Sequence, residues 1–200
     1  MIEPERRRPG RPRKSDAAGM DTRERVMDAA QGLIQGRGYT GCSIKDVAEA
    51  VGLRTATIHH HFPTKGDLGA AVARRYREAI KVRLAEIVAR DASPAGRLRG
   101  LAGIFRGVLE TENRLCLCAA LGAEADTLPP QVRAEVEAYF EDAEAWLSGV
   151  FSDLGASAPR DRARAYLSIL EGAMLVARAR RDIAWFDATV AGYLAGEGIS

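Results

Sequence analysis

The sequence is poor in cysteine and has no long hydrophobic run. Its 200 residues include 3 cysteines, an odd number and too few for a framework of structural disulfides. No apolar stretch reaches the roughly 18 to 20 residues of a membrane-spanning helix, and no apolar segment follows the basic N-terminus as in a signal peptide. We therefore expect a soluble, cytoplasmic protein without a membrane partner. Its 46% hydrophobic content is enough for a packed core.

Residue patterns of enzymes and metal sites are missing as well. The sequence shows no phosphate-binding glycine loop, no Ser/His/Asp arrangement and no cluster with metal-ligand spacing. The 3 histidines stand together as His59, His60 and His61, but consecutive helical positions differ by about 100°, so their side chains do not converge on one ion. We expect neither an enzyme nor a metal or cofactor site.

Signals of β-structure are absent too, because no segment shows polar and apolar alternation or a hairpin turn. Helical periodicity instead runs through most of the chain, broken by glycine and proline. The sequence predicts an all-α fold of about nine helices. The expected ranges are 21–37, two short helices within 43–62, and then 65–90, 95–112, 115–127, 130–154, 159–181 and 183–195.

Positive charge is concentrated near the N-terminus. Residues 1–70 hold 12 Lys and Arg against 9 Asp and Glu, whereas residues 71–200 hold 17 against 18. Residues 1–19 have little to bury and are expected to be disordered. Within them, residues 6–14 (RRRPGRPRK) match the AT-hook core, in which Gly-Arg-Pro lies extended in a minor groove. The alternative is a solvated basic tail that adds only phosphate attraction, and both alternatives favour nucleic acid.

Residues 43–62 have the pattern of a helix-turn-helix. The first helix has one apolar face, Gly52 permits the positive φ that ends it, and a second apolar face follows. In this motif the second helix presents its N-terminal side chains to base edges in the major groove. The apolar positions are Ile44, Val47, Ala48 and Val51, then Leu53, Ile58 and Phe62.

Two helix starts carry the same capping signal. Ser43 is followed three residues later by Asp46, and Thr64 by Asp67. In each pair the hydroxyl can accept a hydrogen bond from a free backbone amide, and the acid interacts favourably with the positive end of the helix dipole. We therefore expect helices to begin just after Ser43 and just after Thr64.

These residues resemble the DNA-binding domain of TetR-family transcriptional regulators. The resemblance rests on helix 1 (RVMDAA from Arg25, then Gly38-Tyr39), on SIKDVA from Ser43, and on IHHHFPTKGDL from Ile58. It implies an all-α homodimer in which a small DNA-binding domain precedes a larger domain that binds a small-molecule effector and dimerises. We expect the segments 1–19 (basic tail), 20–66 (DNA binding) and 67–200 (effector binding and dimerisation).

The resemblance also implies which residues contact DNA. The exposed face of the second helix lies near the bases, Lys65 occupies the family's phosphate-contacting lysine position, and Ser43 brings a helix amide end to a phosphate. His59 stands where the family usually has tyrosine, so its phosphate contact could depend on pH. Arg54 stands at a usual capping position, so either Thr55 caps the helix or Arg54 reaches a guanine or phosphate. The predicted set is Thr40, Ser43, Lys45, Arg54, Thr55, Ala56, Thr57, His59, His60 and Lys65.

For the C-terminal part the sequence predicts an effector pocket between helices, lined by apolar side chains with a few polar groups. Glu124 is the best polar candidate, because it lies in an apolar run and a buried carboxylate needs a partner. For any one residue the alternative is core packing. The candidates are Phe105, Leu109, Cys118, Leu121, Glu124, Phe140, Trp146, Tyr166, Leu170 and Met174.

Cys116 and Cys118 suggest a second kind of sensing. The segment from Arg114 to Glu124 resembles a Cys-Leu…Glu helix in one branch of the family, some of whose members respond to reactive electrophiles or small unsaturated acids. Two residues apart on a helix, the two thiols point about 200° apart and do not bond easily to each other. The alternative is that each cysteine is a small buried hydrophobe.

The last two long helices are expected to dimerise through apolar stripes in a four-helix bundle. A dimer would also set two recognition helices about 34 to 36 Å apart, the spacing of successive major grooves. The predicted interface residues are Ile169, Ala173, Ala177, Ile183, Phe186 and Val190.

The resulting hypothesis is a repressor, released from a palindromic DNA operator when a small-molecule effector favours the form that does not fit DNA. Two alternatives remain: an architectural DNA-binding protein without an effector, and a regulator that senses thiol chemistry through Cys116 or Cys118.

Overall fold

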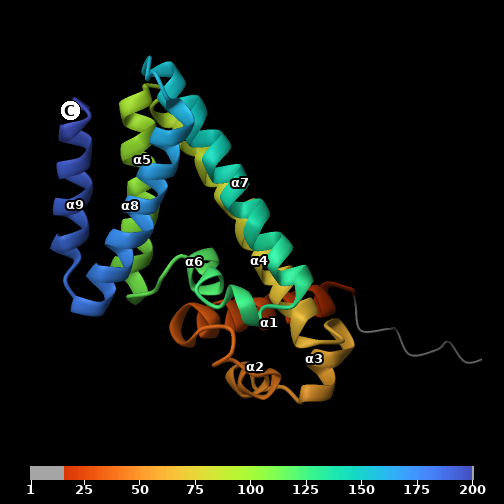
Figure 1. The fold of residues 1–200 in the computed structure, drawn as a ribbon. Helices are drawn as coiled ribbons and strands as arrows, with labels where there is room; N and C mark the ends of the chain where they lie inside the picture. The colour runs from red at the N-terminus through yellow and green to blue at the C-terminus, as the bar shows by residue number, and fades with distance from the viewer. Residues whose placement is uncertain (1–15, 200) are drawn as a thin grey trace, which may run out of the picture.

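The computed structural model describes residues 16–199, and this part of the chain is all-helical (Figure 1). Residues 1–15 of the basic tail expected at 1–19, with the AT-hook match at residues 6–14, lie outside it. No described helix is both long and apolar enough to cross a membrane. The helices are α1 (Asp16–Arg37), α2 (Ile44–Val51), α3 (Thr55–His61), α4 (Lys65–Arg90), α5 (Pro94–Glu112), α6 (Leu117–Gly122), α7 (Pro130–Asp153), α8 (Pro159–Arg180) and α9 (Ile183–Gly196), with a short 3₁₀ helix η1 (Ala125–Thr127) after α6.

Helices α1, α2 and α3 form a small head at one end of the molecule (Figure 1). Helix α4 leaves the head and runs into the body, with α7 packed along it. On the other side α8 packs against α5, α7 and α9, and the short α6 lies against α1 between the two groups. The head is therefore joined to the body through α4 and through the contacts of α1.

Most of the predicted helix boundaries are confirmed. Helix α4 has the expected bounds, and α5, α7, α8 and α9 begin and end within one residue of expectation. Helix α1 begins at Asp16, earlier than the predicted residue 21, so residues 16–19 are helical instead of disordered.

The single helix predicted over 115–127 is wrong. The chain forms α6 and then η1, and between them Glu124 leaves helical geometry with φ of −114° and ψ of 23°. Its side chain turns to the head, where it accepts hydrogen bonds from the backbone. Helical periodicity does not indicate that Glu124 contacts a turn far away in the sequence.

One connected core runs through the head and the body. In α1, Val26, Ala30 and Ile34 are buried, whereas Leu33 is only half-buried. In the body, Tyr166 and Phe151 are fully buried and meet edge to face, with ring centres 6.2 Å apart. The body therefore provides a packed support for the head.

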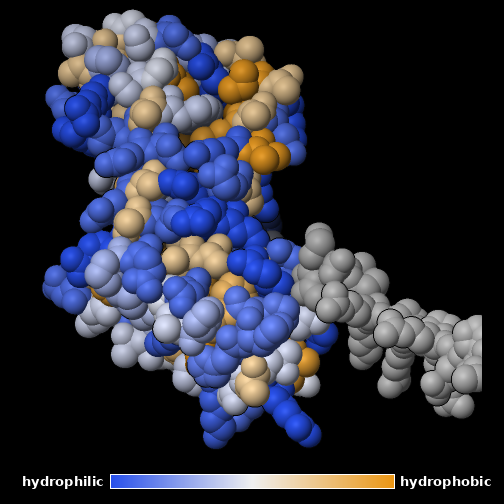
Figure 2. Space-filling model, turned by 90° about the vertical axis from the view of Figure 1, so that its right-hand side faces the viewer, coloured by the Kyte–Doolittle hydropathy of each residue, from blue (hydrophilic) through white to orange (hydrophobic). Residues whose placement is uncertain are grey.

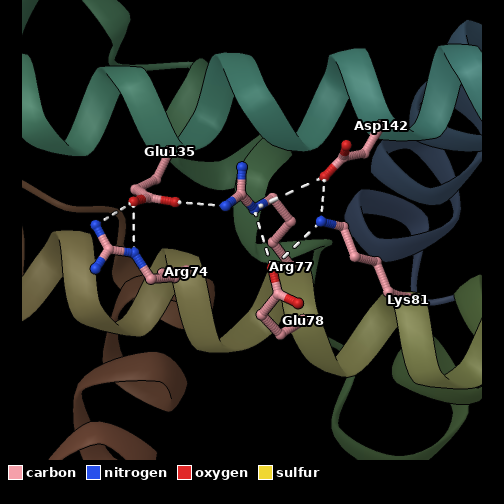
Figure 3. Close-up of polar contacts among 6 residues, drawn as sticks. All are labelled: Arg74, Arg77, Glu78, Lys81, Glu135 and Asp142. Carbon is pink, nitrogen blue, oxygen red and sulfur yellow. Dashed lines mark hydrogen bonds and ion pairs between the residues drawn. The ribbon is translucent and has the colours of Figure 1, made fainter.

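Charged side chains join α4 and α7 (Figure 3). Glu135 on α7 is 8% exposed and pairs with Arg74 at 2.6 Å and Arg77 at 3.4 Å. Further along, Asp142 lies 3.0 Å from Lys81. A carboxylate as buried as that of Glu135 is stable only with such partners, so these pairs fix α7 on the helix that carries the head. The face that includes α4 and α7 is largely hydrophilic (Figure 2).

Candidate nucleic-acid interface and C-terminal cavities

The turn between α2 and α3 has the geometry that the sequence predicts. At the start of α2, Ser43 Oγ accepts from the Asp46 N–H at 3.1 Å, and Asp46 Oδ2 accepts from the Ser43 N–H at 2.7 Å. At its end Gly52 has φ of 68°, and the Leu53 N–H donates to the Ala48 carbonyl at 2.9 Å. Glycine adopts this left-handed conformation with the smallest energetic cost. The cap and the glycine together set the direction of α3.

The N-terminus of α3 differs in one respect from expectation. Arg54, and not Thr55, occupies the N-cap position, and no side chain caps the helix there. The alternative that Thr55 caps α3 is therefore wrong. Arg54 is exposed and makes no ion pair with any described residue. Its guanidinium is thus available to an external acceptor.

The outward face of α3 is polar. Thr55, Ala56, His59 and His60 are exposed, and Thr57 is half-buried. The opposite face is apolar, since Ile58 is fully buried in the core of the head. The predicted recognition residues therefore share one accessible surface of one helix.

The ring of His59 is held against the end of α3. Its Nδ1 lies 3.1 Å from the Pro63 carbonyl, and the tautomer with a proton on Nδ1 donates to that oxygen. His60 packs edge to face on His61, with ring centres 5.4 Å apart, and His61 is half-buried beside the buried Phe62. Of the three rings, those of His59 and His60 are the accessible ones.

Lys65 lies at the start of α4, next to the α1–α2 turn. Its ammonium is 4.1 Å from the centre of the Tyr39 ring, a cation–π distance that limits the freedom of the side chain. The preceding Thr64 forms the predicted capping box, with Oγ1 accepting from Asp67 N–H at 3.0 Å. Lys65 therefore leaves the helix at a fixed position.

The remaining predicted DNA contacts lie nearby but have partners within the chain. Lys45 is exposed and lies 3.7 Å from Glu49 on the next turn of α2. The Thr40 amide donates to Glu124 Oε2 at 2.8 Å. Arg25 begins the RVMDAA motif and is not among the predicted DNA contacts; it donates to the Val51 carbonyl at 3.0 Å and so positions the end of α2. No pattern in the local sequence distinguishes such a positioning arginine from a solvent-exposed one.

Glu124 joins the body to the head. Its Oε1 accepts from the Tyr39 amide at 2.6 Å and its Oε2 from the Thr40 amide at 2.8 Å. Burial raises the pKa of this carboxyl, but the hydrogen bonds from Thr40 and Tyr39 outweigh that effect and the pKa lies below its ordinary value. The carboxylate is therefore bound by the head, which corrects our expectation of a buried acid facing an effector.

Arg178 and Gln35 make further links between head and body. Arg178 on α8 donates to the Gly36 carbonyl at 3.0 Å and to the Asn113 carbonyl at 3.1 Å. Gln35 on α1 donates to the Leu115 carbonyl at 2.7 Å. Together with Glu124, these side chains fix the end of α1 on the body, so a change in the body can reach the head through them.

The other residues predicted for the effector pocket lie in or against the core. Most of them are buried, and two aromatic residues are half-buried. Leu109 borders a cavity of about 510 Å³ at the α8–α9 turn, and Phe140 borders one of about 470 Å³ beside α8. The buried members are Phe105, Leu109, Cys118, Leu121, Tyr166, Leu170 and Met174, and the half-buried ones are Phe140 and Trp146.

A cavity of about 580 Å³ lies between α1, α4 and α5, and none of the predicted pocket residues lines it. Its polar lining consists of arginine, glutamine and threonine, and its apolar lining comes from α4 and α5. These residues belong to three separate helices and to the connection after α5, so no local motif in the sequence marks them. The lining residues are Gln31, Gln35, Arg75, Tyr76, Ala79, Ile80, Arg83, Gly103, Ile104, Gly107, Val108, Thr111 and Arg114.

A buried polar cluster lies deeper in the body. The Cys116 thiol lies 3.4 Å from Tyr139 Oη, and the Cys116 amide donates to the Met174 sulfur at 3.0 Å. Both carboxylate oxygens of Glu171 are buried without a hydrogen-bond partner. Burial raises the pKa of Glu171 to about 7, and the Cys116 thiol lowers this pKa by a smaller amount.

The cysteines of this region are poor candidates for sensing. Cys116 and Cys118 are buried, and burial raises the pKa of each thiol far above its usual value. Since the thiolate is the reactive form, a buried thiol that stays protonated at neutral pH reacts slowly. The structure therefore does not support the thiol-sensing alternative.

The residues predicted for a dimer interface mostly face inward. Ala173, Ala177, Phe186 and Val190 are buried against this chain's own core, and Ile169 and Ile183 are half-buried. A helical stripe that is apolar on two faces does not show by periodicity which face meets a partner. The exposed large apolar side chains on α8 and α9 are Leu175, Val176 and Trp185.

Comparison with known families gives two matches. Residues 26–72, which include the helix-turn-helix, match the family described as bacterial regulatory proteins, tetR family. Residues 94–191 match the C-terminal domain of transcriptional regulators described as LmrA/YxaF-like.

Individual proteins give the same result. A TetR-family transcriptional regulator from Agrobacterium tumefaciens is 32% identical, with a TM-score of 0.86 over 91% of this chain and 99% of that one. A TetR regulator from Legionella pneumophila is 29% identical, with a TM-score of 0.84 over 90% and 97% of the two chains. The transcriptional repressor KstR2 of Mycobacterium tuberculosis is 27% identical over 79 residues, and the match covers only 40% of each of the two chains.

Proposed function

Because this chain belongs to the TetR family of DNA-binding transcriptional regulators, we propose that it is a repressor whose homodimer leaves a palindromic operator when a small molecule binds the body. Residues 20–66 then act as the DNA-binding domain and residues 67–200 as the effector-binding and dimerisation domain. We propose that it acts in the cytoplasm, where its DNA partner lies. The supporting observation is the exposed polar face of α3, held by a capped helix-turn-helix.

We assign base contacts to the N-terminal part of α3 and phosphate contacts to its surroundings. Arg54, Thr55 and Thr57 lie where a helix entering the major groove presents its first turn to base edges. Lys65 and His59 flank that turn and suit phosphates. Of the remaining predicted contacts, Ala56 and His60 share this face of α3, and Thr40, Ser43 and Lys45 lie beside it.

Two substitutions test this division. Lys65→Ala should weaken binding to all DNA and lower the salt slope of the binding constant by about one unit, because one phosphate contact is lost. Thr57→Ala should instead alter base preference at a fixed salt slope. Both are measured by fluorescence anisotropy on a selected operator and on random DNA, at several salt concentrations. Arg90→Ala, at the far end of the same helix α4, is the charge-matched control. If Thr57→Ala weakens binding to both DNAs equally, as Lys65→Ala is expected to do, the assignment is contradicted.

We assign the dimer interface to the exposed apolar side chains of α8 and α9. Leu175, Val176 and Trp185 on these two helices are 55%, 37% and 43% exposed, and a group of exposed apolar side chains suits a protein interface. A second copy that covers them buries this surface. Leu175→Glu should give a monomer in sedimentation experiments and weaken operator binding, since one head spans only one half-site. If the Leu175→Glu variant remains a dimer, the interface lies elsewhere.

A further inference from the structure

The charged residues among the described lining of the cavity between α1, α4 and α5 are all arginines. Arg75, Arg83 and Arg114 line it, whereas no Asp or Glu is among its described lining residues. Arg83 is exposed and makes no ion pair with any described residue. Gln31, Gln35 and Thr111 add neutral hydrogen-bonding groups. The charged groups among the described lining residues are therefore all hydrogen-bond donors, and Arg75 among them is paired with Glu24 and Asp28 of α1.

The rest of the lining is apolar and leaves room. Ile80 is buried, and Tyr76, Ile104 and Val108 are half-buried. Gly107 faces the cavity, and a Cβ added to it meets nothing within 4 Å. A volume of about 580 Å³ is within the range of small-molecule sites. The lining thus combines an apolar wall with a cationic rim.

We propose that this cavity binds an organic carboxylate with an apolar body, the carboxylate at Arg83 and Arg75 and the body against Ile104 and Val108. The inference rests on the proposed function in one respect, because it assigns this class of ligand as the effector. Neutral and cationic molecules of the same shape lack the charge that the arginines select.

The cavity shares a wall with the contacts that hold the head. Arg75 on α4 binds three residues of α1: its Nη1 lies 2.9 Å from Glu24 and 2.8 Å from Asp28, and its Nη2 lies 3.2 Å from Gln31. A bound carboxylate competes with Glu24 and Asp28 for Arg75. Because α1 is part of the head, this competition loosens one of its contacts with the body.

The first test compares three probes of one shape: decanoate and decylammonium, each below its micellar concentration, and 1-decanol below its solubility limit. Binding is measured by calorimetry and by thermal shift on the full chain without DNA. The proposal predicts that decanoate binds about tenfold more tightly than decanol, since a hydrogen bond to a charged group has about that effect, and that decylammonium binds most weakly. Equal binding of the three probes, or no binding of decanoate, overturns it.

The second test locates the site. Gly107→Leu fills the cavity, while Gly149→Leu adds the same side chain on α7, where an added Cβ also meets nothing within 4 Å. Both changes favour helix, so both variants are expected to fold. Decanoate binding should be lost in Gly107→Leu, kept in Gly149→Leu, and weakened about tenfold in Arg83→Gln. Unchanged decanoate binding in Gly107→Leu overturns the assignment to this cavity.

Operator release separates the two proposals. Decanoate that binds in this cavity and releases the operator supports both the site and its role as effector site. Binding there without release supports the anion site and overturns its role as effector site. A protein that fails to bind any selected DNA contradicts the proposed function, and the calorimetric test of the cavity stands independently of that result.

Discussion

Replacing Glu171 by glutamine tests how the core of the body tolerates charge. Glu171 lies on α8 with both carboxylate oxygens buried and without a hydrogen-bond partner. Burial raises its pKa from 4.5 to about 7. The folded protein therefore holds a proton that the unfolded chain releases as the pH rises from about 4.5 to about 7, and folding stability falls through this window.

The size of the effect follows from the two pKa values. Each pH unit between them is worth about 1.4 kcal/mol, so the wild type loses about 3 kcal/mol of stability by the time the pH exceeds about 7. Glutamine keeps the shape of the side chain and does not titrate. We expect Glu171→Gln to lack this loss, so its advantage over the wild type grows between pH 5 and pH 8 by about that amount.

The assay is urea unfolding followed by circular dichroism at pH 5, 6, 7 and 8. One protein concentration is kept throughout, because subunit association contributes to the stability of a dimer. Glu137→Gln, an exposed glutamate on α7, is the matched control and should follow the wild type. If wild type and Glu171→Gln show parallel pH dependence, the carboxyl group is not buried as described.

Three further predictions concern the head and the cysteines. Glu124→Ala should lower the free energy of unfolding by about 1 kcal/mol, because two hydrogen bonds to a partly exposed carboxylate are lost. It should also increase hydrogen exchange at the α1–α2 turn, and unchanged exchange there would argue against its anchoring role. Thr64→Ala should cost about 1 kcal/mol in chemical denaturation through loss of the α4 cap, whereas no loss would show that the cap contributes little. Cys116 and Cys118 should react with iodoacetamide far more slowly in the folded protein than in urea, and equal rates would revive the thiol-sensing hypothesis.

The recognition module could be predicted from local sequence because its determinants are local. Capping by Ser43 and Thr64 and the left-handed Gly52 involve residues within a few positions of one another, and the structure confirms them. The all-helical fold and the bounds of α4 follow in the same way from periodicity and from proline and glycine breaks. Physical chemistry within one or two helical turns is sufficient for such features.

The body was harder to predict, because its important contacts join residues far apart in sequence. Glu124 was singled out as a polar residue in an apolar run, but its partners, the amides of Tyr39 and Thr40, lie more than 80 positions away. Glu171 was missed, although it follows Leu167 by four residues and precedes Met174 by three, on the buried stripe of α8. A charged residue on an apolar stripe is the signal that could have identified it.

A helix-turn-helix and a chain of helices follow from the sequence, since each helix depends on its own periodicity and caps. The packing of the whole chain fixes which apolar face of α8 and α9 is left exposed, and it brings two arginines of α4 and Arg114, which follows α5, around one cavity beside α1. Periodicity shows that a helix has a buried side, but the neighbour against which that side packs depends on how all the helices fit together.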